Sequence, residues 1–151
     1  WSSDVCSSDL LGLTRGELLA GIDHVLVVED DAVLGMVLEQ ALLDAGVAQV
    51  ALSSSTEQAM QHLRQERPGA IVLDVHLADR DDGWAIAELV RTLGPDSPRI
   101  IFSTGAPQDI PEDIAALGCV LEKPYDAAIL VNLLREPEKK GLISRLRDVL
   151  R

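Results

Sequence analysis

Five residues of this sequence could together accept a phosphoryl group, and each lies at or just beyond the end of a short apolar run. They are Glu29, Asp30, Asp74, Thr104 and Lys123. A carboxylate beside a divalent cation can attack phosphorus and form an acyl phosphate. The transferred group carries negative charge, which a lysine can neutralise and to which a threonine hydroxyl can donate a hydrogen bond.

The acidic residues predict a cation site. Carboxylates held close together repel each other and resist joint ionisation, and a bound divalent cation relieves that cost. Oxygen ligands without a His/Cys cluster suit Mg²⁺, which keeps several of its water molecules. We therefore predict a Mg²⁺ site beside Asp74, and the small Gly105 would leave the approach to it open.

Short strand-forming runs alternate with helical patterns along the chain. Strands are expected at His24–Val28, Gln49–Leu52, Ala70–Leu73, Arg99–Phe102 and Cys119–Leu121. Helices are expected at Ala32–Ala45, Ser55–Glu66, Trp84–Leu93, Pro111–Leu117 and Asp126–Arg135. The alternation predicts an α/β fold, a doubly wound parallel sheet with helices on both faces. The apolar, non-alternating strands agree, because parallel strands are buried on both sides.

Signals for helix ends accompany the first two helical patterns. Gly46 stands where the first helix would be capped, and Ser54 or Ser55 would begin the second. The first helix carries one apolar face, which consists of Val33, Val37, Leu38, Ala41 and Leu42.

The polar residues should converge on one small site. In an open parallel sheet, ligands bind beyond the carboxyl ends of the strands, near the point where the strand order reverses. Singly, each residue also has a structural role open to it: Asp30 or Asp31 could cap the first helix, and Lys123 could be a surface charge. Five such residues at four strand ends favour a functional site.

Composition limits the classes of function. The net charge of −12 argues against nucleic-acid binding by this segment, which would need a basic patch. No apolar run approaches the roughly 20 residues of a membrane span. Aromatic residues are only 3% of the chain, so the core must be aliphatic.

The first ten residues, WSSDVCSSDL, resemble the conceptual translation of a sequencing adapter. If they are foreign, the natural N-terminus is missing and an upstream domain could have been lost. Cys119 then remains as a single cysteine, which is typical of a cytoplasmic protein without disulfides.

Four segments are expected: the foreign residues 1–10, an extension over 11–23, a main domain over 24–135, and a tail over 136–151. Thr14 to Glu17 fits a capping box. The tail carries an apolar stripe of Leu142, Ile143, Leu146, Val149 and Leu150. Such a stripe fits a homodimer contact, a linker to an output domain, or a helix packed on its own domain.

Four motifs give a specific resemblance. The segments VLVVEDD, IVLDVHLAD, IIFSTG and LEKPY resemble those of the response-regulator receiver family of two-component signalling, over about His24 to Arg135. The resemblance implies the strand order 2-1-3-4-5. It also implies a cis Lys123–Pro124 peptide bond.

The same resemblance implies a role for each site residue. Asp74 would be the phosphoacceptor, and Glu29 and Asp30 would form an acidic pocket. Mg²⁺ would be held there with Asp74 and the backbone carbonyl of His76, whose side chain would point outward. Thr104 would be the switch hydroxyl, and Lys123 would contact the phosphoryl group.

Such a domain would be a switch and not an enzyme with a separate substrate. A sensor histidine kinase or a histidine phosphotransfer protein would donate the phosphoryl group. The output partner is left open, and the changed surface would lie around the fourth helix, the fifth strand and the fifth helix. The chain could be a stand-alone, single-domain regulator, the receiver part of a hybrid histidine kinase, or a piece of a larger response regulator.

Two departures from the family pattern and three other functions also bear on the interpretation. The stretch from Asp74 to Gly83 is one residue longer than usual, and Val120 replaces an aromatic residue often found three positions before the lysine. A phosphatase of the haloacid-dehalogenase type would want a second Asp where His76 stands. A receiver-like module that is never phosphorylated would not need the complete set of residues. A flavodoxin-like cofactor binder would need a phosphate-cradling loop, which is missing.

Overall fold

All five apolar runs form one parallel sheet in the computed structural model, which describes residues 22–76, 84–91 and 97–136. The strands are β1 (His24–Val28), β2 (Gln49–Ser53), β3 (Ala70–Asp74), β4 (Arg99–Thr104) and β5 (Cys119–Glu122). Their order across the sheet is β2-β1-β3-β4-β5, as predicted. The order reverses between β1 and β3, where a ligand crevice is expected.

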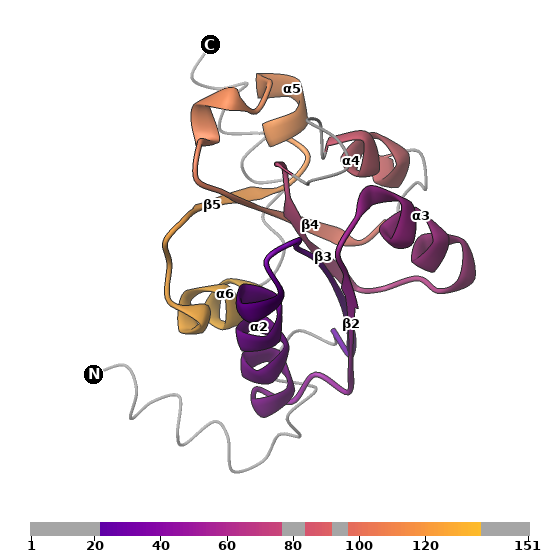
Figure 1. Cartoon of the computed structure of the whole chain (residues 1–151), viewed down its shortest axis with the longest axis vertical. Coiled ribbons are helices and arrows are strands. Elements are labelled where there is room, and N and C mark those ends of the chain that lie inside the picture. Colours follow the sequence, from indigo (N-terminus) through magenta and orange to yellow (C-terminus); the bar gives the residue numbers. More distant parts are fainter. Residues whose placement is uncertain (1–21, 77–83, 92–96, 137–151) are drawn as a thin grey trace.

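The helices lie in two layers, one on each face of the sheet (Figure 1). They are α2 (Ala32–Asp44), α3 (Thr56–Gln65), α4 (Trp84–Arg91), α5 (Glu112–Ala115) and α6 (Ala127–Arg135). A short 3-10 helix, η3 (Pro107–Asp109), precedes α5 and was not predicted. The capping box over 14–17, the apolar stripe of the tail and the stretch from Leu77 to Gly83 lie outside the described residues.

Alternate residues of each strand face opposite layers. In β1, Val25 and Val27 pack with α2 and α6, whereas Leu26 and Val28 pack with α3, α4 and α5. All four side chains are fully buried. This two-sided burial is the reason for the apolar, non-alternating sequence of the strand.

Helix α2 has well-defined ends. Asp31 is its N-cap, and its side chain accepts hydrogen bonds from the backbone N–H groups of Val33 and Leu34 at 3.0 and 3.2 Å. Gly46 follows the helix with φ 106°, a conformation that glycine adopts without strain. Of the two acids considered as caps, Asp31 has this role, and Asp30 belongs to the strand end.

The predicted apolar face of α2 is only partly buried. Leu38 and Leu42 pack on the sheet together with Gly35, but Val33 is 73% exposed and Val37 is also exposed. Positions 35, 38 and 42 share the side of the helix that meets β1 and β2, and Val33 and Val37 lie on the other side.

The other predicted features agree with the structure or differ only slightly from it. Ser55 is the N-cap of α3, and the Lys123–Pro124 peptide bond is cis, both as expected. Strands β3 and β4 extend through Asp74 and Thr104, so these residues lie within strands and not just beyond them. Within the described part, no helix is long and apolar enough to cross a membrane.

Burial in the central strands should dominate stability. Ile71 is fully buried in the core of one layer, so we expect Ile71→Ala to lower the free energy of unfolding by about 2 to 5 kcal/mol. The matched control is Val33→Ala, which shortens an exposed side chain and should change it by less than about 0.5 kcal/mol. Urea denaturation measures both, and equal losses would contradict the packing described.

Candidate functional site

Three carboxylates meet where β1 and β3 end. Glu29 and Asp30 follow β1, and Asp74 is the last residue of β3. One ligand oxygen from each of the three lies within 4.8 Å of the others. Glu29 and Asp74 are buried, whereas Asp30 is exposed. Parallel pairing of β1 with β3 brings these ends together, as the sequence predicted.

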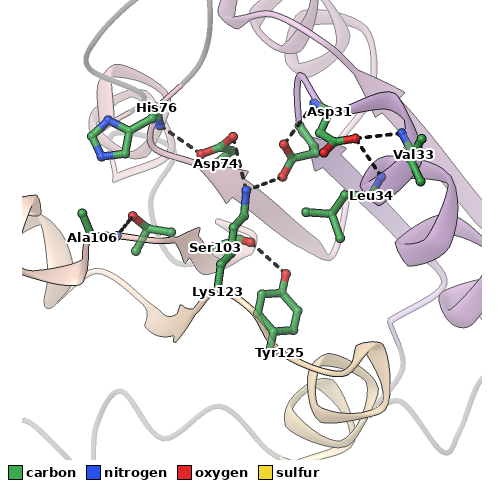
Figure 2. Close-up of polar contacts among 11 residues, drawn as sticks. Asp31, Val33, Leu34, Asp74, His76, Ser103, Ala106, Lys123 and Tyr125 are labelled. Carbon is green, nitrogen blue, oxygen red and sulfur yellow. Dashed lines mark hydrogen bonds and ion pairs between the residues drawn. The ribbon is translucent and has the colours of Figure 1, made fainter.

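Lys123 directly follows β5, an edge strand of the sheet, and its side chain reaches the same cluster. Its Nζ lies 2.8 Å from Glu29 Oε2 and 3.5 Å from Asp74 Oδ2. The backbone N–H of Lys123 donates to the Thr104 carbonyl at 2.7 Å, which continues the pairing of β5 with β4 beyond the strand. Figure 2 shows the lysine between Asp74 and the residues that follow β1.

Burial and charge shape the acid–base properties of this cluster. Burial raises the pKa of Glu29 to about 7, although the hydrogen bond from Lys123 opposes the shift. Burial alone would lower the pKa of Lys123, but its hydrogen bond to Glu29 and the charge of Asp74 raise it overall. The lysine therefore stays charged among the acids and partly offsets their repulsion.

The residues just after Asp74 hold its side chain in place. The backbone N–H of His76 donates to Asp74 Oδ1 at 3.0 Å, so one carboxylate oxygen is held by the loop and the other faces Lys123. The His76 ring points away from Asp74 (Figure 2), and its Nε2 lies 3.7 Å from Asp109 Oδ2. Its side chain is 48% exposed, in agreement with the predicted outward orientation.

Thr104 lies at the end of β4, next to this cluster, and is fully buried. Its hydroxyl oxygen accepts a hydrogen bond from the Ala106 backbone N–H at 3.0 Å. The hydroxyl is thus engaged with its own loop. Because the oxygen acts as the acceptor in this bond, the O–H can still donate to a group on Asp74.

A further polar contact beside the site was not predicted. The Ser103 hydroxyl and the Tyr125 hydroxyl lie 2.8 Å apart and share a hydrogen bond (Figure 2). Burial raises the pKa of Tyr125, so its hydroxyl remains protonated. Tyr125 follows Lys123 by two residues, and the LEKPY segment contained the only signal for it. Val120, three positions before the lysine, is a partly exposed aliphatic residue.

The donor set fits Mg²⁺. The three grouped ligands are all carboxylate oxygens, and two of them belong to buried side chains. Hard oxygen donors of this kind hold Mg²⁺ together with water molecules.

Comparison with known proteins gives the family. A family model described as the response regulator receiver domain matches residues 25–135. The chain belongs to the response regulator receiver family.

The curated relatives of this receiver domain include a sensory transduction protein and a response regulator. The chain is 30% identical over 119 residues to the sensory transduction protein LytT of Bacillus cereus, and this match spans 77% of the chain and 47% of the relative. It is 30% identical over 116 residues to the response regulator MprA of Mycolicibacterium vanbaalenii, and this match spans 74% of the chain and 48% of the relative. The chain thus spans about half the length of these relatives.

Solved structures show the same fold. A CheY-like receiver domain from Methylobacillus flagellatus superposes with a TM-score of 0.67 at 24% identity, over 76% of this chain and 97% of that one. The receiver domain of a sensor histidine kinase from Pseudomonas aeruginosa superposes with a TM-score of 0.63 at 29% identity, over 75% of this chain and 94% of that one. The latter structure has a magnesium ion coordinated in its active-site cleft.

The pKa of Glu29 predicts a pH dependence of stability in the Mg²⁺-free protein. Its folded value of about 7 exceeds its ordinary value of 4.5, so the folded state binds a proton more tightly than the unfolded state. As the pH falls from 8 to 5.5, the free energy of unfolding of the wild type should rise by about 1 to 3 kcal/mol relative to that of Glu29→Gln. The amide of the variant does not titrate and so removes this contribution. Denaturation in a chelator at several pH values measures this, and a constant difference would refute the shift.

Proposed function

We propose that this receiver domain is the phosphoacceptor of a two-component phosphorelay and that Asp74 accepts the phosphoryl group. The observation that carries the proposal is the cluster at the strand ends. Asp74 lies 3.5 Å from the Lys123 amino group and belongs to a group of three carboxylates. Membership of the receiver family supports the same chemistry.

In the proposed step, an oxygen of the Asp74 carboxylate attacks phosphorus while the phosphorus–nitrogen bond of a phosphohistidine breaks. The electron pair of that bond returns to the imidazole, which takes up a proton as it leaves. Lys123 is close enough to Asp74 to follow the negative charge onto the phosphoryl oxygens. The His76 backbone N–H keeps the carboxylate oriented during the attack.

Mg²⁺ would be held by Asp30, Asp74 and the backbone carbonyl of His76, with Glu29 completing the acidic pocket. Bound there, the ion would neutralise charge on the phosphoryl oxygens. The support is the grouping of the three carboxylates and the magnesium ion in the cleft of the 29%-identical Pseudomonas aeruginosa receiver.

The switch would begin with two side chains. The Thr104 hydroxyl, whose oxygen accepts a hydrogen bond from Ala106, would donate its O–H to the phosphoryl group, and Lys123 would move from Glu29 toward the same group. Both residues lie at the ends of β4 and β5, so the surface around α5, β5 and α6 would respond. The Ser103–Tyr125 hydrogen bond joins β4 to the segment that precedes α6, so it would lie in the path of this change.

The donor would be a sensor histidine kinase or a histidine phosphotransfer protein. The chain spans about half the length of its curated relatives. Its relatives include whole response regulators and the receiver of a sensor kinase, so either parent protein is compatible with it. The haloacid-dehalogenase alternative has no support, since the family match and the fold are those of a receiver.

Incubation with acetyl phosphate and Mg²⁺ should add a single phosphoryl mass to the intact protein. Asp74→Asn should abolish the addition because it removes the nucleophilic oxygen, and chelation of Mg²⁺ should suppress it. Asp44→Asn, an exposed acid at the end of α2, is the matched control and should label like wild type. Intact-mass spectrometry reads the result. Undiminished labelling of Asp74→Asn would sink the proposal.

Lys123→Ala should slow phosphorylation by about 10² to 10³-fold, because the charge of the transferring group loses its nearest cation. Arg64→Ala, which removes an exposed cation from α3, should leave the rate unchanged. Circular dichroism confirms that both variants are folded, and the rate is followed by the fraction of phosphorylated protein over time. Equal rates for the two variants would mean that Lys123 takes no part.

A further inference from the structure

Two histidines and a glutamate gather at the opposite end of the sheet from Asp74. His24 is the first residue of β1, and Glu29 follows the same strand, so the two ends lie roughly 16 Å apart. His62 lies in the last turn of α3, and Glu66 is the C-cap residue of that helix. No step of the proposed phosphoryl transfer uses these three residues.

The geometry of the three side chains is compact. The Nε2 atoms of His24 and His62 lie 3.2 Å apart. Glu66 Oε2 lies 3.5 Å from the first nitrogen and 3.6 Å from the second. Each residue thus points one potential ligand atom at a common centre.

These distances match a particular ion. Zn²⁺ binds imidazole nitrogen and carboxylate oxygen at about 2.0 to 2.1 Å in tetrahedral geometry, which separates neighbouring ligand atoms by about 3.3 to 3.4 Å. The observed triangle of 3.2, 3.5 and 3.6 Å is close to one face of such a tetrahedron. Two imidazoles and one carboxylate are also a ligand set that Zn²⁺ uses, with water in the fourth position.

We propose that His24, His62 and Glu66 form a second metal site, specific for a divalent transition metal of the Zn²⁺ type and separate from the acidic Mg²⁺ pocket. This inference is independent of the proposed function of Asp74. Imidazole nitrogen favours such metals over Mg²⁺, which prefers oxygen ligands. The two sites therefore differ in the ions that they select.

The surroundings favour binding. The Gln49 side-chain amide donates to Glu66 Oε2 at 3.2 Å and holds the carboxylate toward the histidines. Such supporting hydrogen bonds orient metal ligands. Glu66 is exposed, so water can reach the fourth position.

A bound ion would fasten the end of α3 to the start of β1. His24 belongs to the sheet, whereas His62 lies in the last turn of α3 and Glu66 caps that helix four residues later. Binding only to the folded protein would stabilise it by mass action.

The test is calorimetric titration of the full chain with Zn²⁺, in excess Mg²⁺ so that the acidic pocket is occupied. We expect one Zn²⁺ per chain. His62→Ala should weaken binding by about 100-fold or more, and Glu66→Gln should weaken it by about tenfold or more, because each removes one of three protein ligands. Both residues lie at the C-terminal end of α3. Circular dichroism checks that the variants fold.

Two controls separate this site from other binding. Gln61→Ala changes an exposed neighbour of His62 on α3, and His76→Ala removes the third histidine of the chain. Both should bind Zn²⁺ like wild type. Absence of Zn²⁺ uptake, or uptake that His62→Ala and Glu66→Gln leave unchanged, would overturn the proposal and leave a hydrogen-bonded histidine pair.

Thermal unfolding gives an independent readout. Zn²⁺ at about 100 times its dissociation constant should raise the Tm of wild type and of Gln61→Ala by roughly 10 °C. The same concentration should raise the Tm of His62→Ala by no more than about 2 °C, because binding to this variant is about 100-fold weaker. An equal rise in all three proteins would place the ion elsewhere and contradict the site.

Discussion

The contact of Lys123 with Glu29 and Asp74 is the interaction on which the site depends. A single amino group lies 2.8 Å from one buried carboxylate and 3.5 Å from the other. Without a cation, two such acids would resist joint ionisation, and burial raises the pKa of Glu29 even with the lysine in contact. In the proposed function, a divalent ion would relieve the remaining repulsion between the acids. The lysine, which lies against Asp74, would then respond to a change of charge on that residue.

The sheet supplies the precision that this contact needs. Lys123 and Glu29 are 94 residues apart in the sequence, and they meet because β1, β3, β4 and β5 are paired in parallel with their carboxyl ends together. Two-sided burial of β1 and β3 fixes those strands in register, so that Val28 pairs with Leu73 and Asp74 pairs with Ser103. A shift of one residue would turn buried side chains to the other layer. The packing of the core therefore also fixes the geometry of the charged cluster.

Much of this could be predicted from sequence because it depends on local patterns. Apolar strands, Gly46 after α2, and the polar residues at strand ends are each visible within a few residues. The exposed side of α2 was misjudged because helical spacing gives a face but not which part of it meets the sheet. The Ser103–Tyr125 hydrogen bond and the His24–His62–Glu66 cluster were missed for a different reason. Ser103 and Tyr125 are 22 residues apart and His24 and His62 are 38 apart, so no spacing rule connects either pair. His62 and Glu66 have helical spacing, but that spacing alone does not indicate that His24 lies beside them.

The central claim is that phosphoryl transfer ends on the Asp74 carboxylate. An acyl phosphate is reduced by borohydride to the corresponding alcohol, which leaves a stable mark on the acceptor residue. Protein treated with acetyl phosphate and Mg²⁺, then reduced and digested, should carry that mark at Asp74 alone when its peptides are sequenced by mass spectrometry. A mark at Asp30, at Glu29 or at any other residue, with Asp74 unmodified, would contradict the account.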